Sequence, residues 1–420
     1  MRQRRVILLT GATGFVGSRL AKGLLEQGHT VLVLLRPKAR SKGGRPIPMA
    51  SRAAELKRSL KLDSASMRRL IPVQGDLASL SPRDLSRRLT QATQRLGQPP
   101  VLHGVLHAAA RLQMDHPHLS EAQREATRRS NERTNVMGLK QLLQALKLFS
   151  PAQFWPSPRI LRPSNIAGPG SKDAYMAFLH YLNQGFMGMQ LSGVGSRLVG
   201  RLPRGGVVPL PGNPRVTLDI VDVSDVVRAT LALLSLDLQV CTAEGTSPGR
   251  FLLMSTAYAH GAAQGLQLER ALGPAEALRH RNSYESIKTK AEAVLADWAQ
   301  EPARYNHLCG TAPPTLSRVA ECTLAGIGRS KTAIQRIAFR TPGEDFENAM
   351  RGLRLASPLT YKIADGLWRA VPMLLAYLNR PTGVSFDTRH TSADLAKMKL
   401  RYAPRAFNRA YVRALVASLS

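Results

Sequence analysis

The segment from residue 6 to residue 37 restricts the possible folds of this chain more than any other. Its sequence, VILLTGATGFVGSRLAKGLLEQGHTVLVLLRP, reads as a strand, a glycine turn, an amphipathic helix and a second strand. The run from Val6 to Leu9 is continuously apolar, as expected of a parallel strand that is covered on both faces. Apolar residues recur at helical spacing from about Phe15 to Gln27. This unit predicts an α/β protein with a doubly wound parallel sheet.

The turn between the first strand and the helix contains Gly11, Gly14 and Gly17. A phosphate can approach the backbone only where side chains are absent, and the N-terminus of the following helix offers unbonded amides and the positive end of a dipole. The glycine spacing alone is weak, but inside a complete strand–helix–strand unit it predicts a Rossmann dinucleotide site. A tight turn without a ligand is the alternative.

The residue that ends the second strand indicates which dinucleotide would bind. Enzymes that prefer NAD usually carry an acid there for the ribose hydroxyl, whereas this chain has Arg36, followed by Lys38 and Arg40. Cations at this point favour the 2′-phosphate of NADP over NAD, and a solvated basic loop is the alternative.

Two further strands continue the alternating pattern. IPVQGD ends at Asp76, and VLHGVLHAAA, residues 101–110, is followed by a helix that contains RTNVMGLKQLLQAL. His107 and the small residues after it lie at the carboxyl end of a strand, where ligands bind in open α/β sheets. His116 and His118 have no cluster of partner ligands nearby in sequence, so no metal is expected.

The net charge of +31 raises the question of a nucleic-acid partner. The cations are spread along all 420 residues with few aromatics between them, which indicates a general arginine bias, so no nucleic-acid partner is expected. Anionic substrates and a peripheral contact with an acidic membrane surface are both compatible with this charge.

The cysteines and the hydropathy pattern suit a cytoplasmic protein. Cys241, Cys309 and Cys322 show no CxxC spacing, as in a reducing compartment. No run of about 20 apolar residues occurs, and the apolar stretch 363–378 is interrupted by charges and a proline. A homodimer is compatible with the sequence.

The stretch NSYESIK places Tyr284 and Lys288 four residues apart, on one face of a helix. A nearby ammonium favours the phenolate and lowers the phenol pKa toward the range of a general acid or base. The same pair on a solvated helix face would be an ordinary surface contact.

Several segments together resemble signatures of the extended short-chain dehydrogenase/reductases: TGATGFVG, the GD of VQGD, HAAA, NVMG, MSTAYAHG, NSYESIK and ILRPSNIAG. Within that superfamily, these segments are most similar to those of the branch that contains fatty acyl and thioester reductases. The resemblance implies that Tyr284 donates a proton to a carbonyl oxygen, that Thr256 or the adjacent Ser255 hydrogen-bonds that oxygen, and that Lys288 also holds the nicotinamide ribose. The cofactor contacts that it implies fall on Thr10, Gly11, Thr13, Gly14, Phe15, Val16, Gly17, Arg36, Asp76, Leu77, His107, Ala108, Ala109, Asn135, Pro163 and Lys288.

The order of the motifs departs from the family pattern, in which the MSTAY strand and the YxxxK helix come before the ILRPS strand. Here RILRPSNIAGPG, residues 159–170, comes first, and the block from FLLMSTAYAHG to NSYESIKTKAEAVL follows at 251–295. The junctions lie in linker-like sequence at 150–158, 241–249 and 299–305. We expect the strands to keep their family positions in the sheet while only the connections change, so that MSTAY lies beside VLHGVLHAAA and Tyr284 faces Thr256.

The sequence therefore predicts an NADP(H)-dependent reductase of a carbonyl or acyl-thioester substrate, with a lipid-like substrate expected. Its doubly wound core would have a smaller, mainly helical substrate lobe. We expect the core at 1–168 and 215–310, and the lobe at 169–214 and 311–420. Arginines in the glycine-rich stretch 195–214 could bind an anionic group, and 350–380 could form an acyl-binding wall. Two alternatives are a nucleotide-sugar epimerase or dehydratase that retains NAD, and a sensor protein that binds the cofactor without chemistry.

Overall fold

The protein is represented by a computed structural model. It describes residues 4–37, 47–97, 101–111, 120–150, 153, 155–171, 208–239, 249–274, 278–328, 335, 337–340, 344–356 and 384–417. Lys38, Arg40, His116, His118, Cys241, residues 195–207 and residues 357–383 lie outside these ranges, so the hypotheses that involve them stay predictions.

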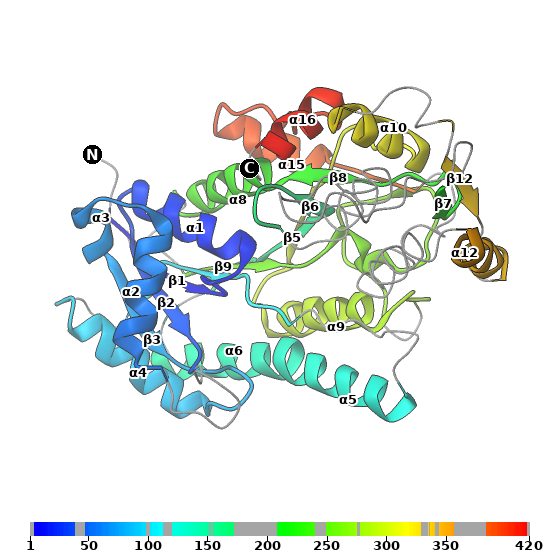
Figure 1. The fold of residues 1–420 in the computed structure, drawn as a ribbon. Helices are drawn as coiled ribbons and strands as arrows, with labels where there is room; N and C mark the ends of the chain where they lie inside the picture. Colours follow the sequence, from blue (N-terminus) through cyan, green and yellow to red (C-terminus); the bar gives the residue numbers. More distant parts are fainter. Residues whose placement is uncertain are drawn as a thin grey trace.

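The centre of the fold is a seven-stranded, wholly parallel sheet in the order β11-β5-β9-β4-β1-β2-β3 (Figure 1). This confirms the predicted doubly wound α/β fold. The strands are β1 (Val6–Thr10), β2 (Thr30–Leu35), β3 (Leu70–Gln74), β4 (Gly104–His107), β5 (Arg159–Pro163), β9 (Arg250–Met254) and β11 (Arg304–Leu308).

Helices cover both faces of the sheet, because successive side chains of each strand point to opposite sides. Ile7 and Leu9 of β1 pack with one set of helices, while Val6 and Leu8 pack with the other. The first set contains α1 (Phe15–Glu26), α2 (Met49–Leu60), α8 (Val223–Asp237) and α15 (Arg389–Lys397). The second contains α4 (Pro82–Gln94), α6 (Gly138–Phe149) and α9 (Ser283–Trp298).

Shorter elements surround this core. The small parallel strand pairs are β6 (Asn165–Ala167) with β8 (Ile220–Asp222), β7 (Val208–Pro211) with β12 (Ile337–Arg340), and β10 (Leu266–Gln267) with β13 (Ser385–Phe386). The remaining helices are α3 (Ser64–Arg68), α5 (Glu121–Glu132), η1 (Arg133–Met137), η2 (Ala257–His260), α10 (Leu316–Gly326), α12 (Glu344–Ala356) and α16 (Arg409–Ala417). Within the described ranges, no helix combines the length and the apolar character that a membrane span requires.

The exchanged strands take their family positions. β9 lies between β4 and β5 although it follows β5 in the chain, and Val105 of β4 pairs with Phe251 of β9. The prediction that MSTAY lies beside VLHGVLHAAA is therefore confirmed.

The described parts of the junctions lie at the amino ends of the strands, where segments that the family order would join are in contact. After α6, the Gln153 side chain packs against Gly249, which precedes β9; a Cβ at Gly249 would lie 2.7 Å from the Gln153 amide nitrogen. After α9, Gln300 accepts a hydrogen bond of 3.2 Å from the Trp155 amide, just before β5. Glu301 accepts one of 2.8 Å from the Ser157 hydroxyl. Noncovalent contacts thus replace two peptide connections of the family order.

Candidate active site

The glycine turn after β1 is shaped by close backbone packing. Gly11 has a φ of 75°, and a Cβ there would lie 2.6 Å from the amide nitrogen of Ala109. A Cβ at Gly17 would lie 2.0 Å from the carbonyl oxygen of Gly11. Gly14 is the N-cap of α1 and supplies no side-chain cap to the helix amides. These features fit a pyrophosphate, because the backbone is accessible and the helix N-terminus can donate to it.

Thr10 and His107 join β1 to β4 beside this turn. The Thr10 hydroxyl accepts a hydrogen bond of 3.2 Å from the Ala109 amide, so its own proton is available to His107 Nδ1, which lies 2.9 Å away. Burial, reinforced by the positive charge of Lys288, lowers the pKa of His107 to about 3. His107 is therefore neutral and shapes the floor of the predicted cofactor site.

Arg36 and Asp76 follow the next two strands. Arg36 is exposed just after β2, whose Leu34 pairs with Thr10 at the end of β1. Asp76 follows β3, is half-buried and accepts a hydrogen bond of 3.0 Å from the Ala78 amide. The structure thus brings both side chains to the same edge of the sheet as the glycine turn.

Asn135 holds the loop that follows β4. It lies in η1, a π-helical turn between α5 and α6, a distortion that is frequent at functional sites. Its side-chain oxygen accepts a hydrogen bond of 2.7 Å from the Arg111 amide, and its nitrogen donates one of 2.9 Å to the Arg111 carbonyl. The geometry therefore has Asn135 positioning the loop beside the predicted cofactor site.

Tyr284 and Lys288 lie on the first turns of α9, which begins at the N-cap Asn282. Lys288 is 5% exposed, and its Nζ donates a hydrogen bond of 2.9 Å to the carbonyl of Met254 at the end of β9. The same nitrogen lies 5.8 Å from the centre of the Tyr284 ring. Burial lowers the pKa of Lys288 to about 8, against the opposing charge of Glu292. This pair is not a solvated surface contact.

The two adjacent hydroxyls after β9 have different partners. Ser255 donates a hydrogen bond of 2.5 Å to Glu292. Thr256 is the N-cap of η2, and its hydroxyl oxygen accepts a hydrogen bond of 3.3 Å from the Tyr258 amide. Because Thr256 uses only acceptor capacity in this bond, its proton can be donated to a substrate oxygen.

The sequence analysis did not identify Arg162 and Glu292, which form a buried ion pair below the site. Arg162 Nη2 lies 2.5 Å from one Glu292 oxygen, and its Nε lies 3.0 Å from the other. Arg162 is next to Pro163, at the end of β5. Two signals could have revealed the pair: a charged residue inside a buried strand requires a partner, and Glu292 is one helical turn after Lys288.

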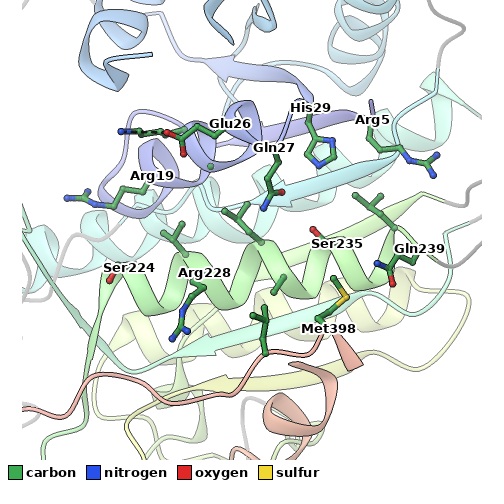
Figure 2. Close-up of a pocket in the computed structure, with 17 residues that line it drawn as sticks. Arg5, Arg19, Glu26, Gln27, His29, Ser224, Arg228, Ser235, Gln239 and Met398 are labelled. Atoms are coloured by element: carbon green, nitrogen blue, oxygen red, sulfur yellow. Dashed lines mark ion pairs between the residues drawn. The ribbon is translucent and has the colours of Figure 1, made fainter. Parts of the chain in front are cut away.

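A separate groove of about 950 Å³ lies between α1 and α8 (Figure 2). None of the predicted catalytic residues lines it. Three of its cations already have partners: Arg19 donates to the Phe15 carbonyl, Lys22 pairs with Glu26, and Arg228 pairs with Asp225. We assign it no role in the chemistry.

Among the described residues, no cluster of three metal-ligating side chains occurs.

Comparison with known proteins gives a partial match in sequence and a match in fold. Residues 9–154 match the family model described as "Male sterility protein". The chain is similar in structure to the terminal R domain from the myxalamid PKS-NRPS biosynthetic pathway, with 14% identity, a TM-score of 0.54 and coverage of 100% of this chain and 91% of that one. It is also similar to dTDP-glucose 4,6-dehydratase from Bacillus anthracis str. Ames in complex with NAD, with 11% identity, a TM-score of 0.46 and coverage of 99% and 96%. No curated protein matches the sequence.

The fold is a doubly wound α/β fold, and its glycine turn has the backbone shape that a nucleotide phosphate needs. The match over residues 9–154 and the fold shared with the terminal R domain agree with the resemblance to the extended short-chain dehydrogenase/reductases.

Proposed function

We propose that the protein is an NADP(H)-dependent reductase that acts on a carbonyl or acyl-thioester group, with a lipid-like molecule as substrate. One observation carries the proposal. The buried Lys288 ammonium bonds to the carboxyl end of β9, with Tyr284 one turn away on α9 and the glycine turn on the same sheet edge. The match to the family model described as "Male sterility protein" and the similarity to a terminal R domain agree with this class.

The backbone around Gly11, Gly14 and Gly17 would hold the pyrophosphate of the cofactor. Arg36, exposed after β2, would pair with the 2′-phosphate that distinguishes NADP from NAD. When bound, the nicotinamide would supply the hydride. The other steps depend on the chain's own side chains.

Tyr284 would donate the proton that the substrate oxygen needs as the hydride arrives. The Lys288 ammonium stabilises the resulting phenolate and so favours proton release from Tyr284. Each unit by which a phenol pKa falls corresponds to about 1.4 kcal/mol, and the partly desolvated position of Lys288 strengthens its effect. Thr256 would donate a hydrogen bond to the same oxygen and orient it.

NADPH oxidation should be measured with acyl-CoA thioesters, aldehydes, ketosteroids and nucleotide sugars, followed by the Tyr284→Phe variant. Removing the phenol proton should lower turnover of the accepted substrate by about 10²- to 10⁴-fold. NADPH affinity should change less than about threefold, because the phenol is not part of the predicted pyrophosphate cradle.

Tyr411→Phe is the matched control, because that tyrosine lies on α16 and bonds to Asp222. It should retain wild-type turnover. Full activity of Tyr284→Phe would refute the catalytic role. NADPH binding without turnover of any of these substrates would instead favour a cofactor sensor.

A further inference from the structure

Three buried side chains from different elements meet below the candidate site. Arg162 is the last residue but one of β5, Ser255 follows β9, and Glu292 lies on α9. Glu292 binds both of the others, at 2.5 Å from Arg162 Nη2 and 2.5 Å from the Ser255 hydroxyl. Arg162 is 0% exposed and Glu292 3%, so neither reaches solvent. We call these three residues the buried clamp.

The clamp residues adjoin both Lys288 on α9 and Thr256 after β9. Glu292 is one turn after Lys288, and Ser255 stands between Met254, whose carbonyl binds Lys288, and Thr256. Arg162 also donates a hydrogen bond of 2.9 Å to the Arg270 carbonyl and lies 4.5 Å from the centre of the Tyr305 ring. These contacts hold the guanidinium inside the protein, so Arg162 acts on the site through Glu292.

We propose that the buried clamp is a positioning device that fixes α9 against β5 and β9 and supplies the carboxylate charge that acts on Lys288. Ser255 belongs to this device, which leaves Thr256 as the hydroxyl for the substrate. The importance of the clamp for catalysis rests on the proposed function. Its effect on Lys288 can be measured without a substrate.

The electrostatic surroundings of Lys288 give the direction of this effect. Burial lowers the pKa of Lys288 to about 8, and the negative charge of Glu292 opposes that fall. Removing the Glu292 charge should therefore lower the pKa further. Besides Lys288, the titratable and charged groups of α9 are Tyr284, Glu285, Lys290, Glu292 and Asp297. Those of the helices packed against α9 are Arg133 on η1, Tyr258 and His260 on η2, Lys140 and Lys147 on α6, and Glu121, Arg124, Glu125, Arg128, Arg129 and Glu132 on α5. His107 and Arg162 lie near the carboxyl ends of β4 and β5.

The experiment is a ¹³C NMR titration of the protein labelled at lysine Cε, with the Lys288 signal assigned by its loss in Lys288→Arg. Glu292→Gln keeps the shape of the side chain and removes its charge. It should lower the Lys288 pKa by about half a unit or more. A double variant, Arg162→Met with Glu292→Leu, replaces the pair by apolar side chains of similar volume and should fold. It should show a smaller fall, because the positive charge of Arg162 is removed together with the negative charge of Glu292.

Asp237→Asn is the matched control, because it removes the charge of a carboxylate that pairs with Arg159, the other fully buried arginine of β5. Asp237 lies 2.7 Å from Arg159 at the amino end of that strand. This variant should lose stability but leave the Lys288 pKa unchanged. An unchanged Lys288 pKa in both Glu292→Gln and the double variant, or an equal fall in Asp237→Asn, would overturn the proposal.

The outcomes for the clamp and for the proposed function are independent. Turnover by the wild-type protein, together with an unchanged Lys288 pKa in both Glu292→Gln and the double variant, would reject the clamp and keep the reductase. A lowered Lys288 pKa in Glu292→Gln, in a protein that turns over no substrate, would support the electrostatic link between Glu292 and Lys288 and reject the reductase function.

Discussion

The part of the chain before the first junction and the part after it build one sheet in different ways. Residues 6–149 follow the family order, and the family match covers residues 9–154, ending inside that junction. Beyond it, β5 and β9 occupy neighbouring places in the sheet in exchanged chain order. A comparison that follows the chain stops where the order changes, whereas the sheet continues. In this protein, side-chain pattern and pairing set the place of a strand more than chain order does.

The location of the junctions explains why the exchange can be accommodated. Their described residues lie at the amino ends of the strands, where Trp155 and Ser157 bond to Gln300 and Glu301. The glycine turn, His107, Met254 and Pro163 lie at the carboxyl ends. Changing connections at one edge leaves the predicted cofactor edge unaltered.

The two parts also use different interactions to fix their register. β1 is buried and apolar up to Thr10. β5 carries two fully buried arginines, Arg159 paired with Asp237 and Asp394, and Arg162 paired with Glu292. A slip of β5 by one residue would turn both arginines away from these carboxylates, and an unpaired buried charge is strongly unfavourable. The two arginines therefore favour one register of β5 against α8, α9 and α15, which carry these carboxylates.

The largest expected effect in the part that keeps the family order comes from Gly17→Ala. The new Cβ would lie 2.0 Å from the Gly11 carbonyl oxygen, so the backbone of the turn must move. We expect a loss of about 1–3 kcal/mol in the free energy of unfolding. NADPH affinity should fall by about ten- to a hundredfold. Isothermal titration calorimetry and chemical denaturation measure both quantities.

Gly352→Ala is the control for that substitution, because Gly352 lies in α12 with no heavy atom within 4 Å of an added Cβ. Alanine there should stabilise the helix by about 0.5–1 kcal/mol and leave NADPH binding unchanged. Tight NADPH binding by Gly17→Ala would show that the turn is not the cofactor cradle.

The sequence predicted the doubly wound sheet because its signals are local, whereas the place of β9 beside β4 was predicted from the resemblance to the family. Apolar strands, the glycine turn and the YxxxK spacing each occupy a short window. It did not predict the roles of Arg162, Glu292 and Ser255, because their contacts join residues more than thirty positions apart. The choice between Ser255 and Thr256 likewise depended on a partner, Glu292, that only the fold brings close. The roles of the site residues and the domain boundaries stay predictions.

A smaller effect is expected when the chain is returned to the family order. In such a variant, α6 would connect to β9, α9 to β5, and α8 to β11, with the present linker segments reused. Each new connection joins the amino-end edge of the same sheet, and two of them replace contacts that already exist at Gln153 and Gln300. We expect the same circular dichroism spectrum and an NADPH affinity within about threefold. Loss of both would show that this sequence depends on its exchanged connections.

The most direct test of the central claim, that exchanged blocks rebuild one site in space, is a crystal structure with NADPH bound. The account predicts the pyrophosphate against Gly14 and the hydroxyls of Tyr284 and Thr256 on the same side of the nicotinamide, both within about 3 Å of one substrate-oxygen position. Hydroxyls separated by more than about 10 Å could not share a substrate oxygen and would contradict it.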